Sequence, residues 1–302
     1  MKEKQLKLFR RDISELVWDI IKYLSLFAFV FVCAYPFYYV IIYSFSDPQQ
    51  AMRGIYLLPK GFTLENYKQV LALGGIGHAF FISVARTVLG TLVSLVSTSF
   101  LAYMMTKDFW GKKVVYRFVV ITMYLSAGLI PWYLVMSTYG LTNSFLAYII
   151  PNAISAYHLI LIKTFVEQLP ASMEESATLD GAGLFTVFFR IIIPLSKPIL
   201  ATIAVYCMVG QWNSWQDNFF LNSYSNLETV QLLLRRYLTA AEQLMRSMAE
   251  SGDALGMDLN AALTPESIRM TAVVITMTPV MLVYPFAQKY FTKGIMMGAV
   301  KG

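Results

Sequence analysis

The sequence predicts an all-α integral membrane protein with six transmembrane helices. Of its 302 residues, 57% are hydrophobic and only 14% are charged, whereas a soluble domain carries about 25% charged residues. The apolar residues fall in long blocks rather than at the short periods of a soluble fold. A span needs roughly 20 apolar residues to cross about 30 Å of hydrocarbon. Six segments meet this requirement: about 23–45, 80–106, 114–137, 142–164, 191–217 and 268–288.

The first span is expected to remain in the membrane. It follows a basic segment, residues 1–22, and its apolar run from Leu24 to Phe45 is longer than the ~7–15 residues of a signal-peptide core. No small-residue cleavage site follows the run. Cys33 and Cys207 both fall inside predicted spans, which argues against a secreted disulfide scaffold.

The third and fourth spans form a predicted hairpin. The stretch from Phe118 to Ile162 contains no Asp, Glu, Lys or Arg and is too long for one crossing. It must therefore fold back on itself. Residues 137–143 include Gly140 and Asn143, which tolerate turn geometry, so the turn is placed there.

The distribution of Lys and Arg predicts that both termini are cytoplasmic, because cytoplasmic loops hold the excess of these residues. With the N-terminus inside, 16 of the 24 lie on the cytoplasmic side, 7 lie outside, and Arg86 lies within the second span. The formal charge of +6 thus belongs to the flanks of spans, so membrane lipid is the expected surroundings and no nucleic-acid partner is expected.

Two outer segments, about 46–79 and 218–267, are too long to be plain turns. The second carries apolar residues at helical spacing with charged residues between them, which predicts an amphipathic helix. This helix either packs against the protein's own outer surface or docks on a partner protein. Its predicted apolar positions are Val230, Leu233, Leu234, Tyr237, Ala241, Leu244 and Met248.

These assignments divide the chain into four parts. A cytoplasmic segment, 1–22, precedes the first span and its external segment at 23–79. A core at 80–295 holds five spans, an inward loop at 165–190 and the external segment 218–267. A cytoplasmic tail follows at 296–302.

No catalytic or metal-binding constellation is visible. The sequence lacks the GxxxxGK[ST] loop of nucleotide-binding proteins, an HExxH pattern and paired CxxC motifs. We therefore expect no enzymatic activity and no metal or cofactor on this chain. His78 and His158 lack ligand spacing and are interpreted as satisfied polar residues or packing residues. Arg86 is costly inside a span unless it faces a water-filled cavity, snorkels or finds a partner, which makes it a functional candidate.

The inward loop between the fourth and fifth spans, Glu167 to Pro198, carries the most specific pattern. Pro170 predicts the start of a short helix. Glycines within 181–183 predict a break, and a second short helix with three phenylalanines follows. On the residues alone, the loop is either a helix–turn–helix that presents acidic and aromatic side chains, or a solvated acidic loop with an amphipathic stretch on the membrane.

The spacing in this loop resembles the EAA motif of ABC-importer permeases. That motif reads EAA, three residues, Gly, nine residues, then I-x-L-P. The corresponding residues are Glu175-Ser176-Ala177, Gly181 and Ile191-Ile192-Ile193-Pro194, with departures at Ser176 and Ile193. The resemblance covers about residues 80–295. It implies a type I ABC importer permease fold, in which the loop is a coupling helix seated in a groove of a separate ATPase subunit.

The resemblance also implies roles and partners. Glu175 would pair with the ATPase surface and Gly181 would allow the turn of the loop. The expected partners are a homologous sister permease, two ATPase subunits that bind ATP and Mg, and an extracytoplasmic sugar-binding protein, at the bacterial cytoplasmic membrane. The other loop positions assigned to ATPase coupling are Glu174, Ala177, Asp180, Ala182 and Pro194.

Three further stretches resemble the carbohydrate branch of these permeases. Residues 59–67, 211–215 and 293–302 are similar to the smaller maltose-type permease and, more closely, to the polysaccharide-permease subfamily. The implied function is import of oligosaccharides or polysaccharide fragments by alternating access. In this family such tails reach between the ATPase subunits, which is carried over for residues 298–302.

The end of the fifth span suits a sugar ligand. Aromatic faces stack on the C–H face of a sugar ring, while amides and carboxylates bond its hydroxyls. The alternative is an interfacial belt at the outer leaflet, where Trp commonly lies. The candidates for the substrate pathway are Trp212, Asn213, Trp215, Asp217 and Asn218, together with Arg86.

The main rival is a secondary transporter driven by an ion gradient. That class favours inverted repeats and ionisable residues inside the membrane. No internal repeat stands out, Arg86 and Asp217 are the only ionisable candidates, and the inward loop would have no obvious use. The sugar itself stays open, because Arg235, Arg236 and Arg246 suit an acidic glycan and an acidic patch on a binding protein equally.

Overall fold

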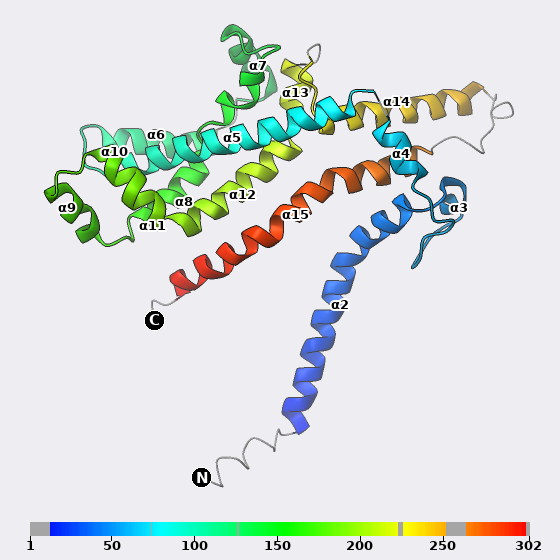
Figure 1. The fold of residues 1–302 in the computed structure, drawn as a ribbon, viewed down its shortest axis with the longest axis horizontal. Helices are drawn as coiled ribbons and strands as arrows, with labels where there is room; N and C mark the ends of the chain where they lie inside the picture. The colour runs from blue at the N-terminus through cyan, green and yellow to red at the C-terminus, as the bar shows by residue number, and fades with distance from the viewer. Residues whose placement is uncertain (1–12, 73, 126, 223–225, 252–263, 300–302) are drawn as a thin grey trace. The chain divides into compact units, whose positions relative to one another are not determined.

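The computed structural model describes residues 13–299 except 73, 126, 223–225 and 252–263 (Figure 1). Within these residues every regular element is a helix and there is no β-strand, which confirms the all-α class. The chain forms two units. One comprises the residues up to Val70 together with Arg246–Ile275, and the other comprises Leu71–Met245 together with the residues from Thr276 onwards.

The first unit contains α2 (Ile13–Ser44), α3 (Pro48–Met52) and the start of α4 (Glu65–Leu71). Asn66 on α4 is fully buried, and its side-chain amide donates to the carbonyls of Ser44 and Ser46 at 2.9 and 2.8 Å. The last carbonyls of a helix have no partner within the helix, so this amide satisfies groups at the end of α2. The segment that follows α2 therefore folds back onto the end of this helix.

The second unit is built on three helices that pack along one another: α5 (Ile76–Met104), α8 (Ala156–Val166) and α12 (Lys197–Asn213). One apolar cluster joins them to the inward loop at the end of α5. Its members with at most 1% exposure are Ala102, Tyr103, Leu159, Ile162, Phe188 and Ile203.

Three helices in the described residues are each long and apolar enough to cross a membrane, and the number rises to five if two bent pairs each count as one span. The single helices are α2, α5 and α15 (Pro265–Ala299), at the predicted spans one, two and six. The predicted fourth span contains η1 (Phe145–Tyr148) and η2 (Ile150–Asn152), followed by α8 after a bend of 48°. The prediction of six spans goes beyond these lengths and stays a prediction.

The predicted third span, 114–137, is wrong as a single helix. The chain forms α6 (Lys112–Tyr124) and α7 (Leu129–Thr138) instead. Gly128 between them has φ +77°, a conformation that residues with a Cβ rarely adopt, and Pro131 fits the first turn of the second helix. The predicted turn at 137–143 is confirmed, because Gly140 and Asn143 have φ of +69° and +52°.

The predicted fifth span, 191–217, is also broken. Three short elements precede α12 with a bend of 84° between them and it: α10 (Leu184–Val187), η3 (Phe188–Ile192) and α11 (Ile193–Leu195). Proline at position 198 lies in the first turn of α12, where the absence of an N–H group costs least. At its other end α12 stops at Asn213, and the separate helix α13 (Gln216–Leu221) follows.

The predicted amphipathic helix is present as α14 (Val230–Ser251), and its external position stays a prediction. Val230, Leu233 and Leu234 are buried, whereas Arg235 and Arg236 are exposed, as the spacing predicts. The side chains of Ala241, Leu244 and Met248, and the segments 1–12 and 300–302, lie outside the described residues.

Candidate functional site

Arg86, near the middle of α5, is 1% exposed and forms an ion pair with Asp217 of α13. The contact is bidentate, with Nη1 3.1 Å from Oδ1 and Nη2 2.5 Å from Oδ2. The break after α12 makes the pair possible, because Asp217 lies in the first turn of α13. The sequence predicted both residues as candidates, and the structure brings them together.

Most of the hydrogen-bond donors of the Arg86 guanidinium are engaged. Arginine has five N–H donors, and four are engaged: one on Nε with Gln211, two on Nη1 with Asp217 and the Ser214 carbonyl, and one on Nη2 with Asp217. The ring of Tyr148 lies 4.3 Å from the guanidinium carbon. A buried charge is stable only when it is paired and hydrogen-bonded, and this arrangement meets both conditions.

Gln211 connects this pair to the neighbouring helices. Its Oε1 accepts from Arg86 Nε at 3.2 Å, and its Nε2 donates to the Tyr148 carbonyl at 3.2 Å. Gly90 on α5 makes room for it, because a Cβ at that position would lie 2.6 Å from Gln211 Nε2. Glycine at position 90 therefore leaves room for the Gln211 side chain, which would have to shift if a Cβ were added.

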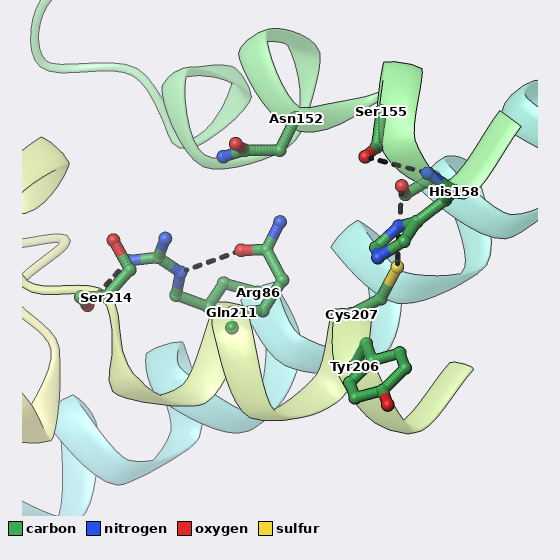
Figure 2. Close-up of a pocket in the computed structure, with 10 residues that line it drawn as sticks. Arg86, Asn152, Ser155, His158, Tyr206, Cys207, Gln211 and Ser214 are labelled. Atoms are coloured by element: carbon green, nitrogen blue, oxygen red, sulfur yellow. Dashed lines mark hydrogen bonds between the residues drawn. The ribbon is translucent and has the colours of Figure 1, made fainter. Parts of the chain in front are cut away.

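Beside Gln211 lies a polar cavity of about 280 Å³ between α5, η2, α8 and α12 (Figure 2). His158 and Tyr206 stack with ring centroids 6.2 Å apart, and the His158 Nδ1 lies 3.6 Å from the Cys207 sulfur. The volume is near the lower end of the ~300–1,000 Å³ of small-molecule pockets. The lining residues are Arg86, Ser94, Asn152, Ser155, His158, Tyr206, Cys207, Gly210, Gln211 and Ser214.

The chemistry of the cavity suits a polyhydroxylated ligand. Hydroxyl and amide groups both donate and accept hydrogen bonds, and stacked rings offer a flat apolar face. His158 belongs to this wall, where its ring packs against Tyr157 and Tyr206 and its Nδ1 lies next to the Cys207 sulfur. The sequence places two of the lining residues on one helical face, because Cys207 and Gln211 lie four residues apart. It does not show which helices face them, because that depends on packing.

The other candidates at the end of the fifth span do not line the cavity. Trp212 is 5% exposed, donates from Nε1 to the Thr276 carbonyl at 2.8 Å and meets Phe80 edge-on. Asn218 is fully buried and accepts from the N–H and hydroxyl of Thr229. These two side chains therefore connect helices within the fold.

Asn213 and Trp215 face a different environment. Asn213 is exposed and accepts from Gln231 of α14 at 3.4 Å. Trp215 is half-buried, and the guanidinium carbon of Arg235 lies 3.8 Å from the centroid of its ring. The five candidates of the fifth span thus form no single surface, and their roles in transport stay predictions.

The loop between α8 and α12, which the sequence predicts to lie inward, contains the predicted short helix, α9 (Ala171–Leu179). Its end is a Schellman motif, in which Ala182 N–H donates to the Ala177 carbonyl and Gly181 N–H donates to that of Thr178. Gly181 has φ +82°, so the predicted turn is confirmed. No heavy atom lies within 4 Å of where its Cβ would be, so glycine is required here for the backbone angle alone.

The two adjacent glutamates of α9 have different environments. The Glu174 carboxylate accepts from the Tyr103 hydroxyl at 2.8 Å and pairs with Lys107, both at the end of α5. Burial lowers the pKa of Lys107 from its ordinary value. Glu175 is exposed and forms no ion pair among the described residues. The helix is thus tied to α5 by one acid and presents the other.

Aromatic contacts hold the rest of the loop. Phe100 of α5 stacks on Phe185 with centroids 5.4 Å apart and meets Phe188 edge-on at 5.2 Å. Asp180 caps the end of α9, and Pro194 lies in α11. Beside α9, a hollow of about 740 Å³ is lined by Thr106, Lys107, Asp108, Ala171, Glu174, Glu175, Thr178 and Leu179.

Comparison with known proteins gives consistent matches over nearly the whole chain. Residues 90–297 match the family described as "Binding-protein-dependent transport system inner membrane component". The chain is 36% identical over 289 residues to the polygalacturonan/rhamnogalacturonan transport system permease protein YtcP of Bacillus subtilis (strain 168), covering 95% of this chain and 99% of the relative. It is 37% identical to Protein LplC of the same organism, covering 95% of each chain.

A solved structure is also similar. It is the crystal structure of a bacterial ABC transporter involved in the import of the acidic polysaccharide alginate. One chain of it matches with a TM-score of 0.79 and 27% identity, covering 93% of this chain and 99% of that chain.

Proposed function

The chain belongs to the family of binding-protein-dependent transport system inner membrane components, and we propose that it carries oligosaccharides or polysaccharide fragments into a bacterial cell. It is a permease subunit of an ABC transporter and not an enzyme. Two similar proteins support a glycan substrate: YtcP is a permease protein of a polygalacturonan/rhamnogalacturonan transport system, and the solved transporter is involved in the import of the acidic polysaccharide alginate.

The coupling to ATP is proposed to run through α9. The observation that carries this is the arrangement of its two acids: Glu174 pairs with Lys107 after the end of α5, and Glu175 is exposed and forms no ion pair among the described residues. A rigidly held helix with an exposed carboxylate can transmit the motion of an ATPase surface to α5. Charge-assisted hydrogen bonds from a basic ATPase residue to Glu175 would be roughly twice as strong as neutral ones.

The proposed assembly contains this permease, a sister permease, two ATPase subunits that bind ATP and Mg, and an extracytoplasmic sugar-binding protein. The distribution of Lys and Arg supports cytoplasmic termini, with α9 inside and α14 outside. Substrate would pass by alternating access along the polar cavity beside Gln211, whose hydroxyl and amide lining supports contact with a sugar.

The ion-driven rival is disfavoured by the state of its candidate residues. Arg86 and Asp217 neutralise each other in a bidentate pair, and four of five guanidinium donors are engaged. A residue that carries a coupling ion or proton must be able to exchange its partner. This pair would have to break within the fold to do so.

The experiment is uptake of glycan by cells, measured beside recovery of the ATPase with the purified permease. Glu175→Lys should abolish both, because it reverses the charge presented by α9. Gly181→Asp should abolish uptake by distorting the turn at φ +82°. Glu167→Gln is the matched control, because this acid of the same loop pairs with Lys163 of its own chain. Normal uptake and ATPase recovery in both test variants would exclude α9 as the coupling helix.

A further inference from the structure

Arg235 on α14 is exposed, and its guanidinium is held in place by stacking on Trp215. Its guanidinium carbon lies 3.8 Å from the centroid of the Trp215 ring, and its side chain forms no ion pair or hydrogen bond among the described residues. Stacking on an aromatic ring uses the face of the guanidinium plane and leaves the N–H groups at its edges. All five donors of Arg235 are therefore available in a fixed orientation.

Amide side chains surround this stacked pair. Gln231 lies one helical turn before Arg235 on the same face of α14, and its Nε2 donates to Asn213 Oδ1 at 3.4 Å. Asn213 is exposed at the end of α12. We call these four residues the outer cluster: Asn213, Trp215, Gln231 and Arg235. The cluster combines one cation, an aromatic ring and two amides.

Arg86 and Arg236 differ from Arg235 because each of them forms an ion pair. Arg86 is buried and its charge is cancelled by Asp217. Arg236, the next residue along α14, pairs with Glu228 at 2.7 Å. The outer cluster therefore presents a single free positive charge rather than a broad basic surface. An acidic patch on a partner protein is complementary to an extended region of positive potential. One unpaired guanidinium surrounded by amides is instead complementary to a single carboxylate surrounded by hydroxyls.

We propose that the outer cluster binds a sugar unit that bears a carboxylate, and that Arg235 selects for this acid over neutral sugars. The inference rests on the proposed function and on the external position of α14. Arg235 forms a bidentate contact with the carboxylate, and the amides of Asn213 and Gln231 bond the adjacent hydroxyls. Trp215 holds the guanidinium in place, so little side-chain freedom is lost on binding.

The test uses the complete transporter with its binding protein and ATPase, and matched pairs of oligosaccharides of equal length. The acidic probes are oligogalacturonides and oligoalginates, and each neutral counterpart has its carboxylates reduced to primary alcohols. Arg235→Gln should raise the apparent KM for the acidic probe roughly tenfold, the loss expected for a hydrogen bond to a charged group. The apparent KM for the neutral counterpart should stay unchanged.

Two further variants control the comparison. Arg236→Gln removes an adjacent charge that is already paired, so it should alter neither probe by more than about twofold. Arg235→Lys keeps the charge but loses the planar guanidinium that binds a carboxylate in a bidentate manner. It should therefore retain only part of the selectivity for the acidic probe over the neutral one. Yield of the assembled complex should match the wild type in all three variants.

The remaining outcomes separate this inference from the proposed function. An equal loss of both probes in Arg235→Gln would show that the surface docks the binding protein, and would overturn the inference alone. Unchanged kinetics in that variant, or wild-type import of the neutral probes only, would overturn it as well. A wild-type complex that imports none of these glycans in an ATP-dependent manner would overturn the proposed substrate and the inference together.

Discussion

Arg86 and Asp217 lie 131 positions apart in the sequence and form a buried bidentate ion pair between α5 and α13. The pair fixes the point where α12 ends, because Arg86 Nη1 also donates to the Ser214 carbonyl at 3.2 Å. This carbonyl belongs to the C-cap of α12 and would otherwise be free. The polar cavity therefore has one end defined by a neutralised charge pair.

Removing either partner should be strongly destabilising. Arg86→Ala or Asp217→Ala should lower the free energy of unfolding by about 3–5 kcal/mol, because the remaining charge is buried without a partner. The double variant Arg86→Met/Asp217→Leu should recover most of this loss, since no charge then remains. Thermal unfolding of the detergent-purified permease measures both. A double variant as unstable as the sum of the two alanine variants would contradict this account.

Gly90→Ala should destabilise through Gln211. The added Cβ would lie 2.6 Å from Gln211 Nε2 and 2.7 Å from its Cδ, so the glutamine must leave its bonds to Arg86 and Tyr148. Overpacking of this kind costs about 1–3 kcal/mol. The same thermal assay applies, with Gly77→Ala as the control because no atom lies within 4 Å of its Cβ position. The cost should be smaller in a Gln211→Ala background, and an undiminished cost there would rule out this mechanism.

Glu174 should act by positioning α9, in contrast to Glu175. Lys107→Ala and Glu174→Gln should each reduce ATPase recovery with the permease by up to roughly fivefold, since a partly exposed ion pair contributes at most about 1 kcal/mol. The exchange Lys107→Glu/Glu174→Lys should restore recovery, because it re-forms the pair within the chain. If the exchange is as defective as the single changes, Glu174 contacts the ATPase directly.

The orientation predicts which positions an impermeant thiol reagent reaches. After replacement of Cys33 and Cys207 by alanine, Gln243→Cys on α14 should react in intact cells, because its side chain is exposed and α14 is placed outside. Ser172→Cys on α9 is also exposed and should react only after the membrane is permeabilised. The reverse pattern would invert the topology.

Local features of the sequence determined the class of the protein and the shape of its inward loop. Long apolar blocks require a membrane regardless of how helices pack, and the described residues are all-helical as these blocks predict. The turn at Gly181 could also be predicted from the sequence, because a Schellman motif involves only residues within about six positions of one another. The same holds for the turn at Gly140 and for the amphipathic spacing of α14.

Other features depended on which helices became neighbours. The sequence does not show that Arg86 is paired with Asp217, or that Glu174 pairs with Lys107 while Glu175 is exposed. It also does not distinguish Arg235, stacked on Trp215, from Arg236, paired with Glu228. The apolar blocks predicted spans at 114–137 and 191–217 but did not predict the breaks within them. Hydropathy depends on composition and carries no information on the direction of the backbone. Charge pairing and cavity lining are properties of packing between distant segments, so only the tertiary structure decided them.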